Sequence, residues 1–499
     1  MNYSLLSLEI LVTLLGVAVL LADLWIPASA RKLLGYAAAT GAGVRLTYAI
    51  GSGAPADGTA FGGMFVIDAL SNYFKGFFLL AALVVLLLTV DLSDTIKGYA
   101  EYCALILFAT VGMLFAASAN DFVLMFVALE LITVTFFVLV SYDRTRSGSL
   151  EAGVKYLIMG ALASAFMVFG IALIFGSAGT TNFYEIAAHQ AELGKSPVFL
   201  IGLVLTLGGL GFKVAAVPFQ MWAPDVYQGA PPLTTAFLAT GSKAAGFALL
   251  MRVAFSAVPE ITAHWSRLIL VIGVLTLLYG SLCAIPQRSV KRLMGYSSIA
   301  NAGYLLLGMA AVSLSGSTAV LTYLGGYIFT VLAGFAVIAV ITSRSGSDDV
   351  SAFAGLGQRS PILATGLTVS LVSLAGIPPM AGFFGKFLLL KAVANHAGTE
   401  RFFLVALLAA CVGVVISLYY YFNVIRSMFW PKSVPDLTPI AVGGATRLAL
   451  ILAVGGVFYV GILPNALVTG ARQAAAGLAP QTAVAGQAAA APSATAGHH

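Results

Sequence analysis

Long apolar runs separated by short polar connections follow one another along almost the whole chain. About fourteen of these runs reach the roughly 20 residues that a helix needs to cross a bilayer. They cover residues 4–26, 33–51, 69–90, 101–118, 121–141, 153–177, 197–217, 232–254, 266–285, 293–313, 317–342, 361–395, 401–425 and 446–470. The pattern predicts an all-α polytopic membrane protein with about fourteen transmembrane helices.

The composition supports this prediction and excludes two classes of protein. Hydrophobic residues make up 60% of the chain and charged residues only 9%, whereas soluble domains carry roughly 25% charged residues. The pI of about 9.1 could indicate a nucleic-acid-binding protein, but the basic residues lie in short connections, where a membrane protein carries them. No glycine-rich phosphate loop follows a strand-like run. We therefore expect this chain to bind neither nucleic acid nor a nucleotide.

The basic residues also predict an orientation. The first run has no Lys or Arg ahead of it, so we expect a retained span and not a signal peptide. With an external N-terminus, the connections on the cytoplasmic side carry Arg31, Lys32, Lys97, Arg144, Arg146, Lys155, Arg288, Lys291, Arg292, Arg344, Arg359, Arg426, Lys432 and Arg447. The other side carries only Lys75, Lys195, Arg252, Arg267, Lys391, Arg401 and Arg472, with Arg45 near it. Both termini are expected on the outer side.

Two lysines lie inside apolar runs around a break in the helical pattern. Lys213 belongs to the first run of the stretch 207–250, and Lys243 belongs to the second. The segment between them contains Pro218, Pro224, Pro231 and Pro232. A lysine at bilayer depth costs at least ~2.5–3.5 kcal/mol, and a broken backbone there must face protein or water. The arrangement indicates an ion path and not a passive anchor.

A second broken span lies about five spans later, in SLAGIPPMAGFFGKFLLLK. Gly376, Pro378, Pro379 and Gly382 interrupt the run, and Lys386 follows them. Interrupted spans at corresponding positions of two halves indicate the transport site of a repeated fold. Because five is an odd number, successive repeats would have inverted topology. Lysine precedes the prolines in the first break and follows them in the second, which we interpret as loosely consistent with inversion.

One carboxylate, Glu130, lies in the middle of the span NDFVLMFVALELITVTFFVLV. A buried carboxylate needs a cation or becomes protonated, and Lys213 is its natural partner. A purely structural ion pair stays open as an alternative. A lysine beside a carboxylate can gain or lose a proton near neutral pH, whereas arginine stays charged. Together with Lys243 and Lys386, these residues predict a proton relay bridged by water.

Five further residues are accessory candidates. Tyr296, Ser298 and Asn301 place two hydroxyls and an amide in the tenth span, where they could hold water in the path or join helices by hydrogen bonds. Asp225, like Asp68 and Lys75, lies near the end of a span, and a solvated interfacial charge is the favoured interpretation of all three. Lys391 could be an exit residue, but a snorkelling side chain is favoured.

Four stretches of the chain resemble subunit N of the proton-pumping NADH:quinone oxidoreductases, the family of respiratory complex I. They are FKVAAVPFQMWAPDVYQGAP, TAFLATGSKAAGFALL, VKRLMGYSSIANAGYLLLG and LAGIPPMAGFFGKF, and the similarity extends over residues 101–426. The resemblance implies an antiporter-like fold with fourteen helices, two inverted five-helix repeats and broken helices 7 and 12. It also implies that Glu130, Lys213, Lys243 and Lys386 match the family's proton-path residues.

The resemblance divides the chain into an N-terminal three-helix segment (1–100), a first repeat (101–260), a second repeat (261–430) and a last helix (431–473). Residues 474–499 are rich in Ala, Gly and Pro and are expected to be a disordered tail. Two positions depart from the family pattern. Gln220 replaces the usual His and cannot titrate, and GAPPL replaces GAPTP, which puts the second proline at position 232.

The resemblance implies a proton-translocating membrane subunit of a bacterial plasma-membrane complex. NADH, FMN, iron–sulfur clusters and quinone would belong to partner subunits, and this chain would hold no cofactor of its own. Its partners would be the other membrane subunits, antiporter-like neighbours included, and the lipid bilayer. Three alternatives remain: a subunit of a multisubunit cation/proton antiporter, a secondary solute transporter, and a structural subunit with inactive channels. Sodium would need clustered oxygen ligands in the breaks, where the chain has lysines.

Overall fold

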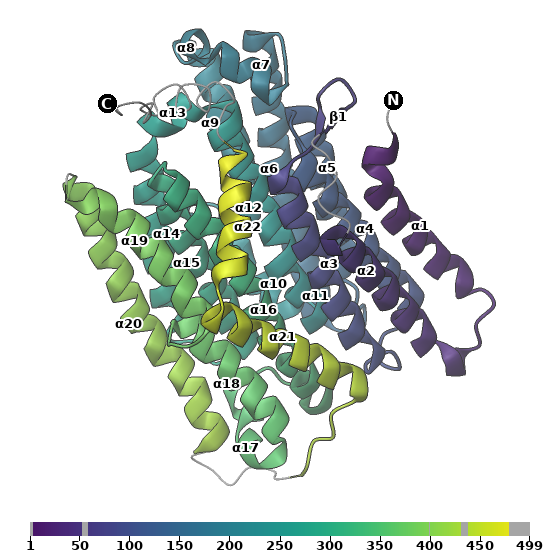
Figure 1. Cartoon of the computed structure of the whole chain (residues 1–499). Helices are drawn as coiled ribbons and strands as arrows, with labels where there is room; N and C mark the ends of the chain where they lie inside the picture. Colours follow the sequence, from purple (N-terminus) through teal and green to yellow (C-terminus); the bar gives the residue numbers. More distant parts are fainter. Residues whose placement is uncertain (1–2, 52–57, 399, 431–437, 479–499) are drawn as a thin grey trace, which may run out of the picture.

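The computed structural model describes residues 3–51, 58–398, 400–430 and 438–478, and these form a bundle of helices with one small hairpin (Figure 1). Within these ranges, eleven helices are long and apolar enough to cross a membrane, and Pro361–Ala375 is a shorter apolar helix. The predicted all-helical membrane fold is confirmed. The predicted number of fourteen spans is not, because several helices carry too many polar residues or are too short.

The elements up to the first broken helix are η1 (Tyr3–Leu6), α1 (Ser7–Ala22), η2 (Ala28–Ala30), α2 (Lys32–Gly51), β1 (Gly58–Ala60), β2 (Phe65–Ile67), α3 (Ala69–Val90), α4 (Tyr99–Ser118), α5 (Phe122–Val140), α6 (Ser147–Ala178), α7 (Phe183–Ala188), α8 (Gln190–Leu193), α9 (Pro197–Val214) and α10 (Trp222–Gly229). The strands β1 and β2 pair antiparallel. Asp121 begins α5 by accepting from the backbone N–H of Val123, as expected of an N-cap residue.

The remaining elements are α11 (Pro232–Phe237), η3 (Leu238–Ser242), α12 (Lys243–Arg252), η4 (Val253–Ala257), α13 (Pro259–His264), α14 (Ser266–Ala284), α15 (Val290–Ala310), α16 (Leu314–Ser345), η5 (Val350–Phe353), α17 (Leu356–Arg359), α18 (Pro361–Ala375), α19 (Ala381–Ala397), α20 (Arg401–Phe429), α21 (Gly444–Ile462) and α22 (Asn465–Ala476). Elements η3 and η4 are π-helical and flank α12 on both sides. Such π segments are frequent at functional sites.

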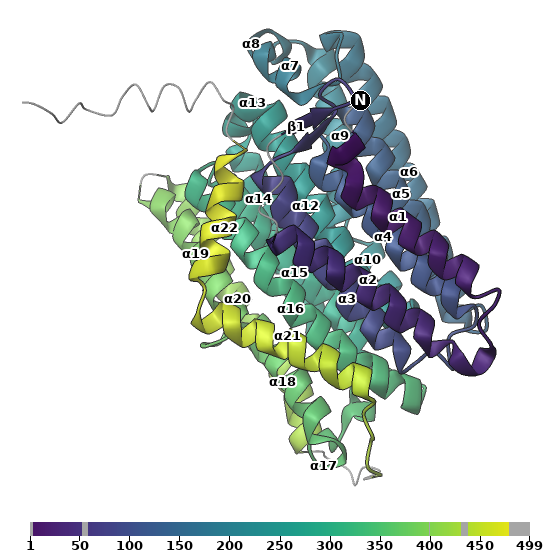
Figure 2. The same ribbon diagram turned by 45° about the vertical axis from the view of Figure 1, so that its right-hand side comes forward.

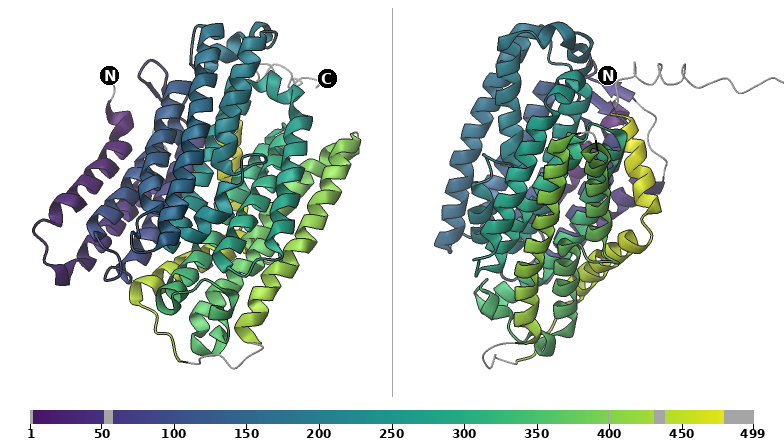
Figure 3. Two further views of the ribbon diagram at one scale, coloured as in Figure 1. Left: turned by 180° about the vertical axis from the view of Figure 1, so that it is seen from behind. Right: turned by 90° about the vertical axis from the view of Figure 1, so that its left-hand side faces the viewer.

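The two ends of the bundle differ in what covers them. One end, called here the hairpin end, carries β1, β2, α7, α8 and α13, and both the start of α1 and the end of α22 lie there (Figure 1). The opposite end carries α17 and the connection between α1 and α2 (Figure 2). Helices α1 and α20 form opposite edges of the bundle, as the view from behind in Figure 3 shows.

The last predicted span, 446–470, is not one straight helix. Helix α21 ends at Ile462, and α22 begins at Asn465 after Pro464. Figure 2 shows α21 crossing the flank of the bundle obliquely, whereas α22 rises towards the hairpin end. Proline cannot continue a helix, which explains the break that hydropathy alone did not predict. Residues 474–476 belong to α22, so the expected tail is shorter, and 479–499 lie outside the described residues.

Glycines bring the central helices into close contact. A Cβ atom on Gly303 of α15 would lie 2.5 Å from the backbone nitrogen of Leu277 on α14. A Cβ atom on Gly170 of α6 would likewise lie 2.5 Å from the carbonyl oxygen of Gly202 on α9. Small residues at such contacts are typical of membrane helix packing, where van der Waals contact and not water drives association. These contacts fix α6 against α9 and α14 against α15, on either side of the buried lysines.

Both predicted breaks are present, and they share one backbone geometry. Helix α9 ends at Val214 with Ala215 in the left-handed region, at φ 58°. Helix α18 ends at Ala375 with Gly376 in the same region, at φ 85°. The next residue in each case donates its N–H to a carbonyl five residues earlier, as in a Schellman motif. The helix then resumes as α10 or α19.

The GAPPL segment does not disturb the helix that follows it. Pro231 precedes α11, and Pro232 is its first residue. Proline is well tolerated at this position because its missing N–H has no partner inside the helix. The departure from the family pattern therefore does not break the helix that leads to Lys243.

Candidate functional site

The first broken helix carries a lysine that faces two residues of α5. Lys213 lies in the last turn of α9, and its Nζ donates a hydrogen bond to Oγ1 of Thr133 at 2.9 Å. Glu130 lies one turn before Thr133 on the same helix. Its Oε1 accepts a hydrogen bond from Oγ of Ser164 on α6 at 2.5 Å. Helices α5, α6 and α9 thus bring a carboxylate, an ammonium and two hydroxyls together.

A small cavity of about 10 Å³ lies between these groups, lined among others by Glu130, Thr133, Ser164 and Lys213. This volume is close to the minimum that holds one water molecule. Within the described ranges no ion pair of 4.0 Å or less joins Glu130 to Lys213. The predicted pairing is therefore not the arrangement observed, because each charged group bonds to a nearer hydroxyl.

Lys243 begins α12, directly after the π segment η3, and meets α15. Its Nζ donates to the carbonyl oxygen of Ser298 and, at 2.6 Å, to the Ser298 hydroxyl. The same hydroxyl bonds to the phenol groups of Tyr227 at 3.0 Å and Tyr327 at 3.3 Å. The Tyr327 ring also lies under the ammonium, with its centroid 5.7 Å away. Ser298 is thus the centre of a polar cluster around Lys243.

Lys386 on α19 has a different environment. Its Nζ donates to the carbonyl oxygen of Leu374, in the last turn of α18, at 2.6 Å. The ring of Tyr304 lies 4.9 Å from the same nitrogen. Last-turn carbonyls carry the negative end of the helix dipole and favour a cation. Among the described residues, no carboxylate lies within 4.0 Å of this ammonium.

Polar side chains of α15 and α16 lie between the surroundings of Lys243 and those of Lys386. Asn301 accepts a hydrogen bond from the Tyr323 phenol at 2.6 Å and donates to Ser297 at 3.4 Å. Ser297 also bonds to Tyr421 of α20. Of the three accessory residues predicted in this span, Ser298 and Asn301 belong to this polar region. Tyr296 instead lies beneath the Arg292 guanidinium, at 5.8 Å.

Asp225, for which a solvated interfacial charge is the favoured interpretation, is partly exposed and is held in two ion pairs. Its carboxylate forms ion pairs with Arg292 of α15 at 2.5 Å and Lys155 of α6 at 2.9 Å. Burial acts to raise the pKa of Asp225, but the hydrogen bonds from Lys155 and Arg292 outweigh it and hold the pKa below its ordinary value. Asp225 thus joins α10 to both α6 and α15. Lys391, in contrast, is exposed on α19, as expected of a snorkelling side chain.

Three basic residues assigned to surface connections are buried. Lys75 pairs with Glu9 at 2.8 Å, and Lys291 donates to the Ala230 carbonyl at 2.6 Å. Arg252 pairs with Asp68 through two hydrogen bonds, of 2.8 and 2.9 Å. Hydropathy counting missed them because one charge hardly changes the mean of a long window. The carboxylate of Glu9 inside the first apolar run was the signal that could have revealed a partner.

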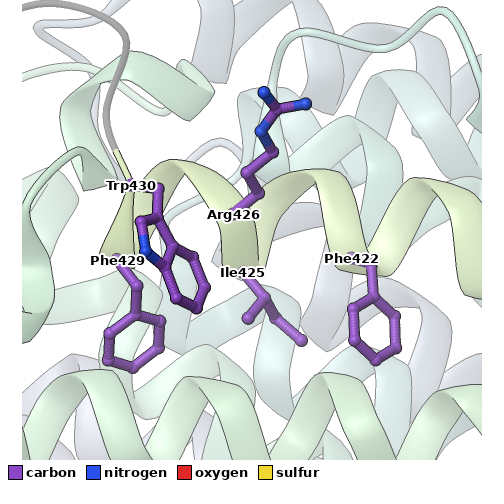
Figure 4. Close-up of a pocket in the computed structure, with 5 residues that line it drawn as sticks. All are labelled: Phe422, Ile425, Arg426, Phe429 and Trp430. Atoms are coloured by element: carbon purple, nitrogen blue, oxygen red, sulfur yellow. The ribbon is translucent and has the colours of Figure 1, made fainter.

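Two remaining features lie apart from the contacts of Lys213, Lys243 and Lys386. Gln220 is buried, and its Oε1 has no hydrogen-bond partner among the described residues. An open groove of about 690 Å³ lies at the end of α20, lined by Phe422, Ile425, Arg426, Phe429 and Trp430. Figure 4 shows that the Arg426 guanidinium extends away from the phenyl rings. The described residues contain no group of three or more His, Cys, Asp or Glu that could hold a metal ion.

Comparison with known proteins places the chain in a family. Residues 119–416 match the family model described as NADH:quinone oxidoreductase/Mrp antiporter, TM. The NADH-quinone oxidoreductase subunit N of Moorella thermoacetica is 40% identical over 93% of this chain and 97% of its own length. A chain of respiratory complex I from Thermus thermophilus is 32% identical, with a TM-score of 0.77 over 93% of this chain and 98% of that one.

A chain of the Mrp complex from a Dietzia species has the same fold, with a TM-score of 0.85 over 97% of this chain and 99% of that one. Its sequence identity is only 21%, so the likeness concerns the fold alone. The relative at 40% identity is an NADH-quinone oxidoreductase subunit N, and the structure at 32% identity is a chain of respiratory complex I.

Proposed function

The chain belongs to the NADH-quinone oxidoreductase subunit N family, and from this premise we propose that it translocates protons along a row formed by Glu130, Lys213, Lys243 and Lys386. The observation that carries the proposal is the burial of three lysines, each 4–5% exposed, at the two broken helices and the π segment. NADH oxidation and quinone reduction belong to partner subunits of the complex. This chain's part is to hold and move protons.

The Glu130 site is where a driving signal enters the row. Lys213 bonds to Thr133, while Glu130 lines the same small cavity and bonds to Ser164. A change of side-chain rotamer would bring the Lys213 ammonium and the Glu130 carboxylate into direct contact. One bridging water molecule would instead link them by hydrogen bonds. A nearby carboxylate favours the charged form of lysine, and its removal favours release of the proton. Altering the Glu130 environment therefore changes whether Lys213 keeps its proton.

Hydroxyl groups continue the row beyond Lys213. The Ser298 hydroxyl bonds to Lys243 and can both donate and accept a hydrogen bond, as can the phenols of Tyr227 and Tyr327. Asn301 and Tyr323 extend the polar region towards α19, which carries Lys386. Water molecules between these groups would complete the path. Lysine is suited to these three positions of the row because, unlike arginine, it can lose its proton when buried.

The proposed setting is the plasma membrane of a bacterium, with the hairpin end on the outer side. The end opposite the hairpin carries most basic connections, which are expected in the cytoplasm. Burial of Lys75 and Arg252 in ion pairs removes two cations from the exposed surface of the hairpin end and strengthens this asymmetry. The other membrane subunits of the complex would contact the apolar flanks of this chain.

The test replaces one lysine of the row and one outside it. Lys213→Ala, in a correctly assembled complex, should lower NADH-driven proton pumping in vesicles by roughly tenfold or more, the scale expected for loss of a proton-transferring group. Coupled quinone reduction should fall with it. Lys155→Ala is the matched control, because Lys155 is a partly exposed lysine whose ion-pair partners among the described residues are Asp225 and Glu151. Normal pumping by an assembled Lys213→Ala complex would contradict the proposal.

A further inference from the structure

A second group of buried charges lies at the hairpin end, outside the row of lysines. Glu9 of α1 and Lys75 of α3 are almost inaccessible to solvent, and Nζ of Lys75 lies 2.8 Å from Oε1 of Glu9. Apart from this ion pair, neither oxygen of Glu9 has a hydrogen-bond partner within the described parts of the chain. Buried carboxylates normally have several donors, so this one lacks its usual complement.

Lys75 has a second partner besides this carboxylate. Its Nζ lies 4.9 Å from the ring centroid of Phe65, which belongs to β2. Phe65 packs edge-on against Phe115 of α4, with the ring centroids 6.1 Å apart, so the ring is held in place. Aromatic faces attract cations. The ammonium therefore keeps a favourable contact even when Glu9 carries no charge.

Other buried polar atoms at this end also lack protein partners among the described residues. They are Oγ of Ser118 and Oδ1 of Asn120, at the end of α4, and Nδ2 of Asn72, on α3 one turn before Lys75. The backbone N–H of Asn120 bonds to Met64 at 2.8 Å, which ties the hairpin to this end of α4. Buried polar atoms of this kind are usually satisfied by ordered water.

We propose that Glu9 and Lys75 form a proton-exchange site, hydrated through Ser118, Asn120 and Asn72 and covered by the hairpin β1–β2. In one state the Glu9 carboxylate pairs with the Lys75 ammonium. In the other, Glu9 has taken one proton from a hydronium ion in the bound water, and Lys75 remains an ammonium on the Phe65 ring. The step forms one O–H bond and breaks another, and its reversal returns the proton to water.

The site goes beyond the proposed function because it gives the N-terminal segment a proton-holding group of its own.

The charged neighbours of Glu9 on the helices packed around it are few among the described residues. Lys75 faces the carboxylate directly, and Asp68 on the same helix is held by Arg252. Arg45 lies towards the hairpin end of α2, and Glu101 lies at the opposite end of α4. Lys75 is therefore the charged group that decides the state of this carboxylate.

The first experiment labels the carboxyl group in the resting, purified complex. Dicyclohexylcarbodiimide reacts with protonated carboxyl groups in apolar surroundings, and mass spectrometry locates the product. We expect labelling of Glu9 that decreases as the pH rises and is absent in Glu9→Gln. Failure of Glu9 to react at any pH would overturn the proposal. Because the assay needs no turnover, Lys213→Ala should leave the labelling unchanged, which separates this site from the row of lysines.

The second experiment asks whether the pair acts in pumping or only holds α1 against α3. Glu9→Gln combined with Lys75→Met replaces both charges with neutral side chains of similar length. We expect assembly to persist and the number of protons pumped per NADH to fall while electron transfer continues. The control is Arg267→Ala with Glu400→Ala, which removes an exposed ion pair of 3.1 Å from the same end and should change nothing.

Each outcome decides the question. An assembled double variant that pumps like the native complex would show that the pair is a structural clamp and overturn the proposal. A loss of pumping that the Arg267/Glu400 control does not share supports it. Where the double variant fails to assemble, the labelling of the native chain decides, because a clamp without proton exchange would leave Glu9 unprotonated and unreactive.

Discussion

The two broken helices have nearly the same backbone but different charges. Ala215 in the first break matches Gly376 in the second, Pro218 matches Pro379, and the hydrogen bond from Phe219 to Ala216 matches that from Met380 to Ile377. The lysines do not match. Lys213 lies before the first break, and the corresponding residue before the second break is Leu374. The lysine of the second break, Lys386, lies after it.

This correspondence changes the interpretation of the lysine positions. The reversed order of lysine and proline in the two breaks was interpreted as loosely consistent with inversion. An inverted repeat is related by a rotation, and a rotation preserves the order of residues along the chain, so inversion does not move a lysine across a break. The matching backbone supports a repeat, and the lysines lie at positions that do not correspond within it.

Each lysine nevertheless reaches the same kind of place. Lys213 lies in the last turn of α9, and Nζ of Lys386 bonds to the Leu374 carbonyl in the last turn of α18. The Lys386 ammonium therefore lies at the carboxyl end of a half-helix, where the backbone favours a cation, and Lys213 belongs to the corresponding turn of α9. The difference lies in the second partner, which is the Glu130 cavity for Lys213 and the Tyr304 ring for Lys386. The Lys213 site can respond to the carboxylate of Glu130, whereas the Lys386 site holds its cation with a backbone carbonyl and an aromatic ring.

The largest expected effect comes from filling the second break. A Cβ atom on Gly382 would lie 1.8 Å from the carbonyl oxygen of Ser373, and the Gly382 N–H bonds to the Ser373 hydroxyl. Gly382→Ala should therefore push α18 and α19 apart and prevent stable assembly, since overpacking alone costs about 1–3 kcal/mol. The measurement is the yield of assembled complex after extraction from membranes.

The first break supplies the matched control. Met221 occupies the position that corresponds to Gly382 and is 62% exposed. Met221→Ala should assemble normally. Equal assembly of both variants would show that the second break tolerates an added side chain and that the two breaks are more alike than their packing indicates.

The sequence predicts much of this comparison. The apolar runs predict the helices, and the proline and glycine clusters predict both breaks, because backbone irregularity at membrane depth depends on local residues. The four charges of the row, three buried lysines and the half-buried Glu130, stand inside apolar runs and can be recognised there. The burial of Lys75, Arg252 and Lys291 could not be predicted from hydropathy, because it depends on which helices meet in space.

Side-chain partners were harder to predict than the helices. Lys213 bonds to Thr133 and not to Glu130, because the hydroxyl lies one helical turn closer to the break. The sequence of α18 does not indicate that the Leu374 carbonyl accepts a hydrogen bond from Lys386, because every residue type has a backbone carbonyl. Contacts between helices depend on rotation about each helix axis, which apolar runs without clear amphipathicity leave undetermined.

The second expected effect tests the lysine that lacks a carboxylate. Lys386→Arg should lower proton pumping almost as much as Lys386→Ala, by roughly tenfold, because arginine keeps its proton at any accessible pH and cannot pass it on. The measurement is the number of protons pumped per electron pair in vesicles that contain assembled complex. Native pumping with arginine and loss with alanine would instead show that Lys386 is a fixed cation held by the Leu374 carbonyl.

The smallest expected effect distinguishes charge from shape in the first site. Glu130→Asp keeps the carboxylate but withdraws it by one methylene group from Ser164, which it now contacts at 2.5 Å. Glu130→Gln keeps the length and the hydrogen bond but removes the charge that favours protonated Lys213. We expect Asp to lower pumping by no more than about twofold and Gln to lower it several-fold, because only Gln removes the charge that favours protonated Lys213. Ser164→Ala separates the two effects, because it removes the hydroxyl partner and leaves the charge. If Glu130→Gln and Glu130→Asp both pump at the native rate in assembled complexes, the carboxylate plays no part in the row, and the two breaks differ in their surroundings without differing in function.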